Sequence, residues 1–142
     1  MNDPQVELIE LQTVEDSRGI LIPINFKDQL KFNPARSFLL TVSSPQTIRG
    51  QHAHIQCLQA IQCLQGEVKI TLIGDNTSVQ HCLSSSNFVL LIPVLTWVSI
   101  EFKTSDSYVI VYASHPYDES DYLRDFDDFQ KIASMTRFGG VN

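Results

Sequence analysis

"RGQHAHIQCLQAIQCLQG", residues 49–66, places two histidines one residue apart in a run that ends on a Gln-Gly pair. In a β-strand, residues i and i+2 point to the same side. His52 and His54 therefore project together from one face, and Gln56 joins them if the strand continues. The stretch predicts a strand that carries a pair of imidazoles, and the surrounding sequence indicates what encloses them.

Short β-rich runs separated by turn residues recur on both sides of this stretch, between residues 6 and 114. In the run that follows it, Val68, Ile70 and Leu72 alternate with polar residues, which is typical of a strand buried on one face. Sequences such as "EDSRG", "LQGE" and "IGDNTS" supply the turns. Many short strands at this spacing predict a sandwich or a jelly roll.

The pattern changes in "YDESDYLRDFDDFQKIASM", residues 117–135. Leu123, Phe126, Phe129 and Ile132 recur there at helical spacing, after Asp and Ser residues suited to an N-cap. We therefore expect an all-β jelly-roll barrel with a short C-terminal helix, and a single domain over residues 1–142.

The composition narrows the class of protein. The net charge is −6 and the pI is about 5.0, without a Lys/Arg-rich run, so we expect no nucleic-acid partner. Cys57, Cys63 and Cys82 show no C-x-x-C spacing and are expected to be buried free thiols in a reducing compartment. The start lacks the pattern of a signal peptide, and the longest apolar run, "FVLLIPVL", is too short for a membrane span. We expect a cytoplasmic protein without membrane contact.

The histidine pair begins a spacing that resembles the first cupin motif, in which two histidines and a glutamate bind a metal inside a jelly-roll barrel. This chain has Gln59 at the glutamate position, with four residues between it and His54. The second cupin motif maps onto Pro93, with Val98 in place of its histidine. A neutral amide is a weak ligand for a transition metal and valine is none, so we expect neither a metal nor another cofactor.

Two roles remain open for the histidines. Imidazole has an unperturbed pKa near ~6.5, so two rings on one face are suited to proton transfer near neutral pH. The alternative is structural, with both rings as half-exposed strand residues that make ordinary hydrogen bonds.

Several motifs together resemble the dTDP-4-oxo-6-deoxy-hexose 3,4-ketoisomerases, small cupins related to domains labelled WxcM-like. They are "RGQHAH" with Gln59, "CLQG" at 63–66, "IPVLTW" at 92–97 and "VYASHPYDESDYLRDFDDF" at 111–129. The order and spacing hold from about residue 16 to residue 129, which is most of the chain.

The resemblance implies a cupin-type fold and a metal-independent isomerase. Its substrate would be dTDP-4-oxo-6-deoxyglucose, whose ketone moves from C4 to C3 on the way to a 3-amino-3,6-dideoxy sugar of a surface polysaccharide such as an O-antigen. The resemblance also implies a homodimer whose subunits exchange N-terminal strands, and an active site in the barrel mouth centred on the two histidines.

Moving a carbonyl between adjacent carbons requires a base for the C3 proton, stabilisation of an enediolate and a proton donor for C4. We expect His54 to be the C–H base and His52 the proton relay, with the reverse assignment open. Arg49 would stabilise oxyanion charge or hold the pyrophosphate, and its alternative is a surface salt bridge. Gln59 would hydrogen-bond the sugar or fix a histidine tautomer.

Two further residues are candidate substrate contacts. Arg18, in "EDSRG", resembles a family turn near the substrate, although Arg-Gly is also common in turns. Trp97 could stack on the thymine or the sugar, or it could belong to the core. For "YDESDY" we expect carboxylates that cap the terminal helix and tyrosines that pack on the barrel.

The chain departs from the family around the barrel mouth. The run "RSFLLTV", residues 36–42, has none of the tyrosines that members usually carry there, Ile55 replaces a usual lysine, and Val98-Ser99 replace usual polar residues. A different nucleotide sugar, or altered stereochemistry, would fit these changes. The alternative function is a non-catalytic cupin that binds a nucleotide sugar or a partner enzyme.

Overall fold

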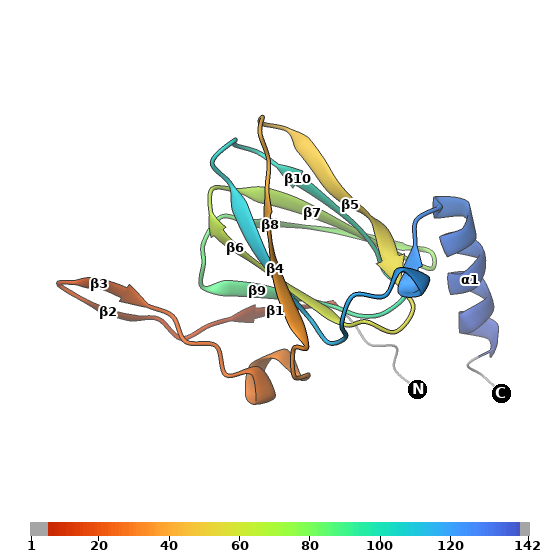
Figure 1. The fold of residues 1–142 in the computed structure, drawn as a ribbon, viewed down its shortest axis with the longest axis horizontal. Helices are drawn as coiled ribbons and strands as arrows, with labels where there is room; N and C mark the ends of the chain where they lie inside the picture. The colour runs from red at the N-terminus through yellow and green to blue at the C-terminus, as the bar shows by residue number, and fades with distance from the viewer. Residues whose placement is uncertain (1–5, 140–142) are drawn as a thin grey trace.

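Two five-stranded sheets face each other and enclose the core of the protein, as seen in a computed structural model that describes residues 6–139 (Figure 1). All pairings between neighbouring strands are antiparallel. The first sheet has the order β1 (Glu7–Glu10), β9 (Phe88–Ile92), β6 (Gln59–Gln65), β11 (Tyr108–Ala113), β4 (Arg36–Thr41). The second has the order β12 (Tyr122–Leu123), β5 (Thr47–His54), β10 (Trp97–Phe102), β7 (Val68–Gly74), β8 (Thr77–Leu83). The predicted all-β, cupin-type barrel is confirmed.

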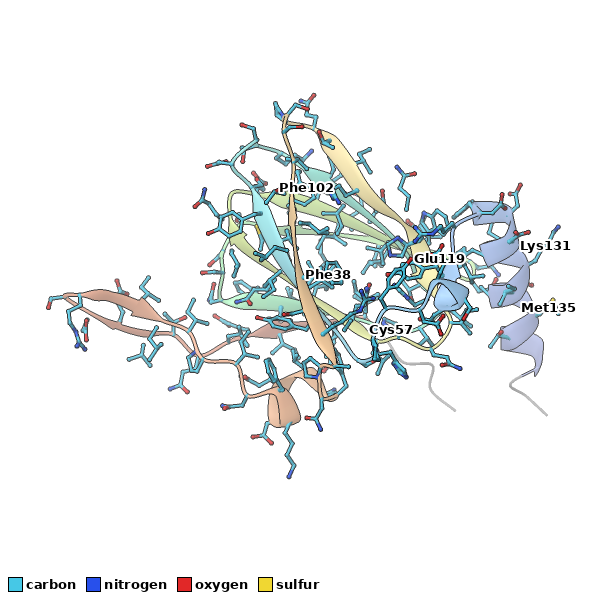
Figure 2. All side chains as sticks on the ribbon, in the orientation of Figure 1. Phe38, Cys57, Phe102, Glu119, Lys131 and Met135 are labelled. Carbon is cyan, nitrogen blue, oxygen red and sulfur yellow. The ribbon has the colours of Figure 1, made fainter. Side chains whose placement is uncertain are left out.

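The space between the sheets is filled by the alternating apolar residues of the strands (Figure 2). Val68, Ile70 and Leu72 of β7 all point into this core and are almost fully buried, as their spacing predicts. The turn from β6 to β7 requires glycine, because Gly66 has a φ of +79° and a Cβ there would lie 2.6 Å from the Cα of Ser107. Any other residue would push β6 and β11 apart.

The N-terminal part of the chain departs from the barrel. Strands β2 (Val14–Asp16) and β3 (Gly19–Leu21) form a separate hairpin that projects away from both sheets (Figure 1). Its apolar side chains are open to solvent, with Ile20 61% and Leu21 64% exposed. A π-helical turn, Phe26–Leu30, then covers the outer face of the first sheet, where Leu30 and Leu91 belong to one buried cluster.

The C-terminal segment pairs with the end of β5 before it becomes helical. A single 3₁₀ turn (Glu119–Asp121) leads into β12, and α1 runs from Phe126 to Gly139. The Asp125 side chain caps α1 by accepting a hydrogen bond from the Asp128 amide at 2.9 Å. The predicted terminal helix is confirmed, but it begins later than the polar run, because "YDESDY" is used for the turn and the edge strand.

Helix α1 packs on the outer face of the second sheet. Ala53, Trp97, Phe129 and Ala133 form a buried cluster there, and the Trp97 ring lies 5.1 Å from Phe126 and 5.6 Å from Phe129 between centroids. Trp97 therefore has the core role that the sequence left open, and it lies on the face of the sheet opposite to the barrel interior.

Two other expectations can be compared with the structure. Cys57 and Cys63 are buried free thiols as predicted, but Cys82 is exposed on β8, because its side chain points outward from an edge strand. None of the helices formed by the described residues is long and apolar enough to span a membrane.

Candidate active site

The two histidines lie side by side at the end of β5, on the barrel side of the strand. His52 pairs with Val98 of β10, a member of the core between the sheets, whereas Ala53 packs outward against α1. The imidazole centroids are 5.1 Å apart, and the ring planes are nearly perpendicular at 88°. His54 is 4% exposed. The prediction that both rings share one face is confirmed.

An irregularity in β5 precedes the pair. Gly50 has a φ of +88° and Gln51 a φ of +60°, and the pairing of β5 with β10 shifts register between Val98 and Ser99. A Cβ at Gly50 would lie 3.0 Å from the Val98 carbonyl oxygen, so a larger residue would disturb the strand pairing. The bulge turns the strand just before His52 and helps to aim both rings inward.

Tyr122 covers the two imidazoles. It is the register partner of His54 in the β12–β5 pair, and its ring centroid lies 4.3 Å from that of His54 and 5.0 Å from that of His52. The guanidinium of Arg36, on β4, donates a hydrogen bond to the Tyr122 hydroxyl at 3.2 Å. A phenol oxygen is therefore held beside the imidazoles by a cation from the opposite sheet.

Charged residues of the same C-terminal segment surround Tyr122. The Arg124 guanidinium lies 4.3 Å from the centre of the Tyr122 ring and donates two hydrogen bonds to Glu119, at 2.6 and 2.9 Å. The Tyr117 hydroxyl also donates to Glu119. The hydrogen bond from Arg124 is the main reason why the pKa of Glu119 falls to about 2. Glu119 is therefore an anion at neutral pH.

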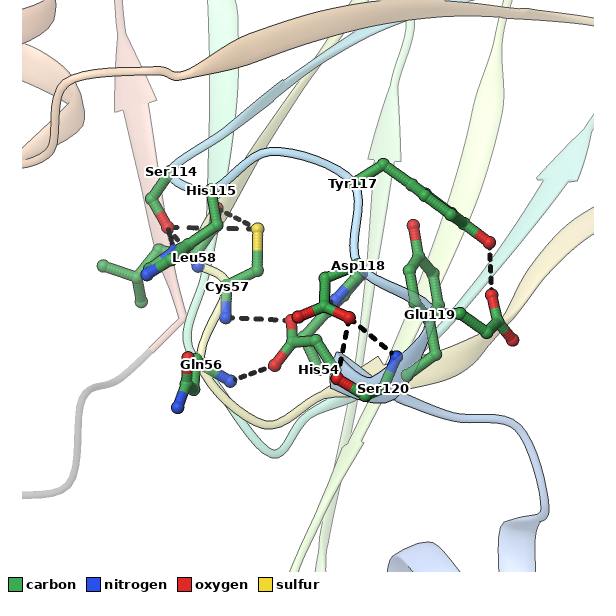
Figure 3. A network of polar contacts seen from close by, with 12 residues as sticks. His54, Gln56, Cys57, Leu58, Ser114, His115, Tyr117, Asp118, Glu119 and Ser120 are labelled. Atoms are coloured by element: carbon green, nitrogen blue, oxygen red, sulfur yellow. Dashed lines mark hydrogen bonds and ion pairs between the residues drawn. The ribbon is translucent and has the colours of Figure 1, made fainter.

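Asp121 joins the C-terminal segment to the end of β5. One carboxylate oxygen lies 2.9 Å from His54 Nδ1 and accepts a hydrogen bond from the Cys57 amide at 3.2 Å, and the other accepts from the Gln56 amide at 2.6 Å (Figure 3). The Ile55 amide donates to the Asp121 backbone carbonyl at 3.0 Å. Burial acts to raise the pKa of Asp121, but the hydrogen bonds from His54 and the amides outweigh it and the pKa is lowered.

Burial makes both imidazoles weak bases. The pKa of His52 falls to about 4, chiefly because burial disfavours its charged form and secondarily because His54 lies nearby. Burial also lowers the pKa of His54, although the hydrogen bond and the charge of Asp121 oppose that change. Within residues 6–139, His52 Nδ1 and His54 Nε2 are buried without a hydrogen-bond partner. Each ring thus has one nitrogen atom that makes no hydrogen bond within the described part of the protein.

The other predicted site residues, Gln59, Arg49 and Arg18, lie in three different parts of the structure. Gln59 is buried at the start of β6, on the same inward face as Ile61, so it belongs to the barrel interior. Arg49 is exposed on β5 and donates a hydrogen bond to the Thr41 carbonyl, at the end of β4, at 3.5 Å. Arg18 lies in the projecting hairpin, paired with Asp16 at 2.6 Å, and is remote from the histidines of its own chain.

Three residues of the cluster were not among the sequence candidates: Arg36, Asp121 and Tyr122. The last two lie in "YDESDY", whose carboxylates we expected to cap a helix and whose tyrosines we expected to pack on the barrel. Tyr122 does pack there, onto the histidines. The pairing of β12 with β5 could not be predicted from the sequence, because a strand of two residues has no detectable alternation.

One group of potential metal ligands exists among the described residues. A ligand atom from each of His54, Cys57 and Asp121 lies within 4.8 Å of the others. Both Asp121 oxygens already accept amide hydrogen bonds, and one also lies at His54 Nδ1. The Cys57 thiol donates to the Leu58 carbonyl at 3.5 Å. This donor set is organised as a hydrogen-bond network and does not fit an ion well.

Comparison with known proteins relates this site to an enzyme family. The family described as "WxcM-like, C-terminal" (FdtA) matches residues 4–134. A TDP-4-oxo-6-deoxy-alpha-D-glucose-3,4-oxoisomerase of Aneurinibacillus thermoaerophilus is 30% identical over 125 residues, which are 88% of this chain and 90% of the relative. The chain belongs to the WxcM-like 3,4-ketoisomerase family. It is an isomerase.

Solved structures agree with the assignment of this isomerase. The sugar 3,4-ketoisomerase QdtA of Thermoanaerobacterium thermosaccharolyticum, in complex with TDP, has a TM-score of 0.87 and 32% identity, covering 92% of this chain and 95% of its own. A 3,4-ketoisomerase of Helicobacter canadensis has a TM-score of 0.87 and 25% identity, covering 91% and 97%. A dTDP-4-dehydrorhamnose 3,5-epimerase of Bacillus anthracis, at 18% identity and a TM-score of 0.74 (82% of this chain, 76% of its own), shares the fold.

Proposed function

We propose that the isomerase moves the ketone of a dTDP-linked 4-oxo-6-deoxy-hexose from C4 to C3. The observation that carries the proposal is the pair of imidazoles 5.1 Å apart at the end of β5, each with a buried nitrogen that has no partner among the described residues. Two such groups can act on adjacent carbons of one sugar. A His-to-Asn variant of QdtA, bound to TDP-4-keto-6-deoxyglucose, supports the substrate class at 31% identity and a TM-score of 0.87, over 92% of this chain and 94% of its own.

The proposed reaction needs proton transfers only. His54 removes the proton from C3, and the electron pair of that bond forms the C3–C4 double bond of an enediolate, with the C4 oxygen taking the charge. The C3 hydroxyl then loses its proton as the new carbonyl forms, and C4 receives a proton. His52 relays protons between the two oxygens. Substrate and product are isomers, so the atoms balance without a metal, a redox partner or another cofactor.

Arg49, Gln59 and Arg18 have supporting roles in this proposal. Gln59, on the interior face, donates to the sugar, and Arg49, exposed on β5, holds the pyrophosphate. Arg18 reaches the site of a second subunit, in a homodimer that exchanges its N-terminal strands. The projecting hairpin supports the last point, because its apolar residues are exposed and its arginine lies away from its own barrel. We propose a cytoplasmic enzyme of 3-amino-3,6-dideoxy sugar synthesis for a surface polysaccharide.

Deuterium exchange tests the reaction directly. With dTDP-4-oxo-6-deoxyglucose in D₂O, we expect NMR to show deuterium at C3 of the substrate and at C4 of a 3-oxo product. His54→Ala abolishes exchange and His52→Ala slows it sharply. His81→Ala, on β8 of the same sheet, is the matched control and leaves the rate unchanged. Folded protein that exchanges neither position would exclude the isomerase mechanism.

A second candidate function is favoured by the residues that differ from those usual in the family, such as the run "RSFLLTV". Phe38 occupies a position in the run "RSFLLTV", and its ring lies 5.1 Å from the Arg36 guanidinium without offering a hydroxyl to the site. A cupin that binds a nucleotide sugar without converting it would have such a site. Calorimetry separates the two functions, because this candidate requires tight dTDP binding and no turnover of any 4-oxo sugar.

A further inference from the structure

We infer that Asp121 is a positioning residue of the active site, which holds the proton of neutral His54 on Nδ1 and leaves the Nε2 lone pair as the proton acceptor. The inference rests on the proposed function, because it assigns a state to the imidazole that acts as base there. It begins from the contacts of the carboxylate.

The surroundings of Asp121 keep it charged. Its oxygens accept hydrogen bonds from the Gln56 amide at 2.6 Å and the Cys57 amide at 3.2 Å, besides the contact with His54. Backbone amides can only donate, so these two partners favour the anion. Their effect, together with that of His54, lowers the Asp121 pKa although burial opposes it. At neutral pH the group is therefore an acceptor only.

An acceptor-only partner fixes the tautomer of His54. The atom 2.9 Å from the carboxylate is Nδ1, so Nδ1 must carry a hydrogen for the contact to be a hydrogen bond. Neutral imidazole has one N–H, and Nε2 consequently holds a lone pair. Nε2 is buried, and within residues 6–139 it has no partner. The ring itself lies against Tyr122 and His52.

The carboxylate also distinguishes the two histidines. His52 is half-buried beside His54, but its pKa of about 4 shows no support from a bonded carboxylate, and the Gly50 carbonyl is the backbone group that raises it. For His54, the hydrogen bond and charge of Asp121 oppose burial, while Arg36 and Arg124 act with burial to lower the pKa. When His54 takes the C3 proton onto Nε2, Asp121 stabilises the imidazolium that forms. Of the two rings, His54 is thus the one that has a carboxylate bonded at 2.9 Å to stabilise its protonated form.

Asp121 also has a structural role, which the test must separate from positioning. Its backbone and side chain together accept from three consecutive amides, those of Ile55, Gln56 and Cys57. Removal of the carboxylate could therefore loosen the loop after β5. A loosened loop would lower the amount of active enzyme, but it would not move a proton from one ring nitrogen to the other.

The test is ¹⁵N NMR of the histidine side chains at pH 7.5, without substrate. In the wild-type protein we expect His54 to carry hydrogen on Nδ1 and a lone pair on Nε2. In Asp121→Asn, we expect the side-chain oxygen of the asparagine to keep the hydrogen bond from the Gln56 amide, because that contact is the shortest of the three. The NH₂ group of the asparagine then faces His54 Nδ1. The proton of His54 then shifts to Nε2. Asp118→Asn, with the same charge change three residues earlier, is the control and leaves the tautomer unchanged.

Kinetics provide the second measurement. Asp121→Asn should lower kcat by about 100-fold or more with little change in KM. Because Asp121 raises the His54 pKa, its loss should also move the acid limb of the kcat/KM profile to lower pH. Asp121→Glu, which restores a carboxylate, should recover part of kcat and the Nδ1–H tautomer.

Two results would overturn the inference: wild-type His54 protonated on Nε2, or a folded Asp121→Asn protein with the wild-type tautomer. The wild-type spectrum decides the point even if the variant does not fold. It also separates this inference from the proposed function, since the tautomer can be observed whether or not the protein converts a sugar.

Discussion

Tyr122 and His54 are register partners on β12 and β5, and their ring centroids lie 4.3 Å apart. This relationship makes the short edge strand a cover for the imidazole pair. The Tyr122 ring lies against both imidazoles, and burial is the main cause of their lowered pKa values, so substitution of this side chain tests how far it controls them.

Two substitutions of Tyr122 distinguish the effect of its ring from the effect of its hydroxyl. Tyr122→Ala should expose both imidazoles, and because burial is the main cause of their lowered pKa values, these values should rise toward about 6.5. Tyr122→Phe keeps the ring and removes the oxygen that accepts from Arg36. We expect it to retain the low pKa values and to lose about tenfold in kcat, the effect of one charge-assisted hydrogen bond.

Histidine NMR titration of both variants checks this expectation. Tyr108→Ala is a suitable control, because this tyrosine lies on β11 at the Gln65 end of its pairing with β6, whereas the site lies near the Gln59 end. Unchanged histidine pKa values in Tyr122→Ala would show that the cover does not control them.

The buried imidazoles also predict how stability depends on pH. The pKa of His52 is about 4 in the folded protein against about 6.5 when unfolded, so the unfolded chain binds a proton that the folded protein excludes. Stability from neutral His52 is therefore complete above pH 6.5 and declines as the pH falls toward 4. The decline should amount to about 3 kcal/mol.

Urea unfolding at pH 7.5, 6.5, 5.5 and 4.5 measures this decline. His52→Gln cannot titrate in that range, so its stability should fall less steeply than that of the wild-type protein. His115→Gln, an exposed histidine, is the control and should follow the wild-type curve. Parallel curves for wild type and His52→Gln would contradict a strongly lowered His52 pKa.

The residues that sequence patterns predicted well were those with a local signature. Period-two alternation identified β7 correctly, and the His-x-His spacing placed both rings on one face, because a strand fixes the direction of alternate side chains. The Asp cap and apolar spacing identified α1. Trp97 had two possible faces to pack on, and only the arrangement of α1 over the second sheet decided between them.

The contacts made by the C-terminal segment could not be predicted from such local patterns. Asp121 meets His54 across 67 residues of sequence, and Arg36 meets Tyr122 across 86. Neither pairing follows from periodicity, because each depends on how two distant strands are placed in the barrel. The polar run "YDESDY" carried a signal in its composition, but its carboxylates suggested a cap for the terminal helix, whereas Asp125 caps α1 and Asp121 lies beside His54.

The position of Trp97 yields a prediction that separates packing from substrate binding. Its ring lies against Phe126 and Phe129 and is 8% exposed, so Trp97→Phe should reduce stability and leave the KM for the nucleotide sugar unchanged. Phe129→Ala, in the same cluster, should lower the free energy of unfolding by about 3–5 kcal/mol. Denaturant unfolding and steady-state kinetics measure both effects. An increase in KM for Trp97→Phe at unchanged stability would favour the stacking role instead.

Metal removal tests the interpretation of Gln59 and Val98. Neither side chain supplies the charge or ring nitrogen of a usual cupin ligand, and Val98 pairs directly with His52. Protein treated with a chelator and then dialysed should retain its full rate and its unfolding midpoint. Elemental analysis of protein purified without chelator is the matching control. A stoichiometric transition metal whose removal abolishes exchange at C3 would contradict a mechanism that uses only imidazoles.

The proposed dimer with exchanged N-terminal strands predicts complementation between an Arg18 variant and a His54 variant. Arg18 lies on a hairpin that projects from its own barrel, whereas His54 lies inside that barrel. If the hairpin serves the partner's site, a mixed dimer of Arg18→Ala and His54→Ala subunits contains one site with both substitutions and one with neither. Unfolding and refolding an equal mixture should then restore about a quarter of the wild-type rate, because half of the dimers are mixed and each has one intact site. Each variant refolded alone is the control. If both residues act within one chain, every site in the mixture lacks one of them and no activity returns, so the rate after refolding distinguishes the two arrangements.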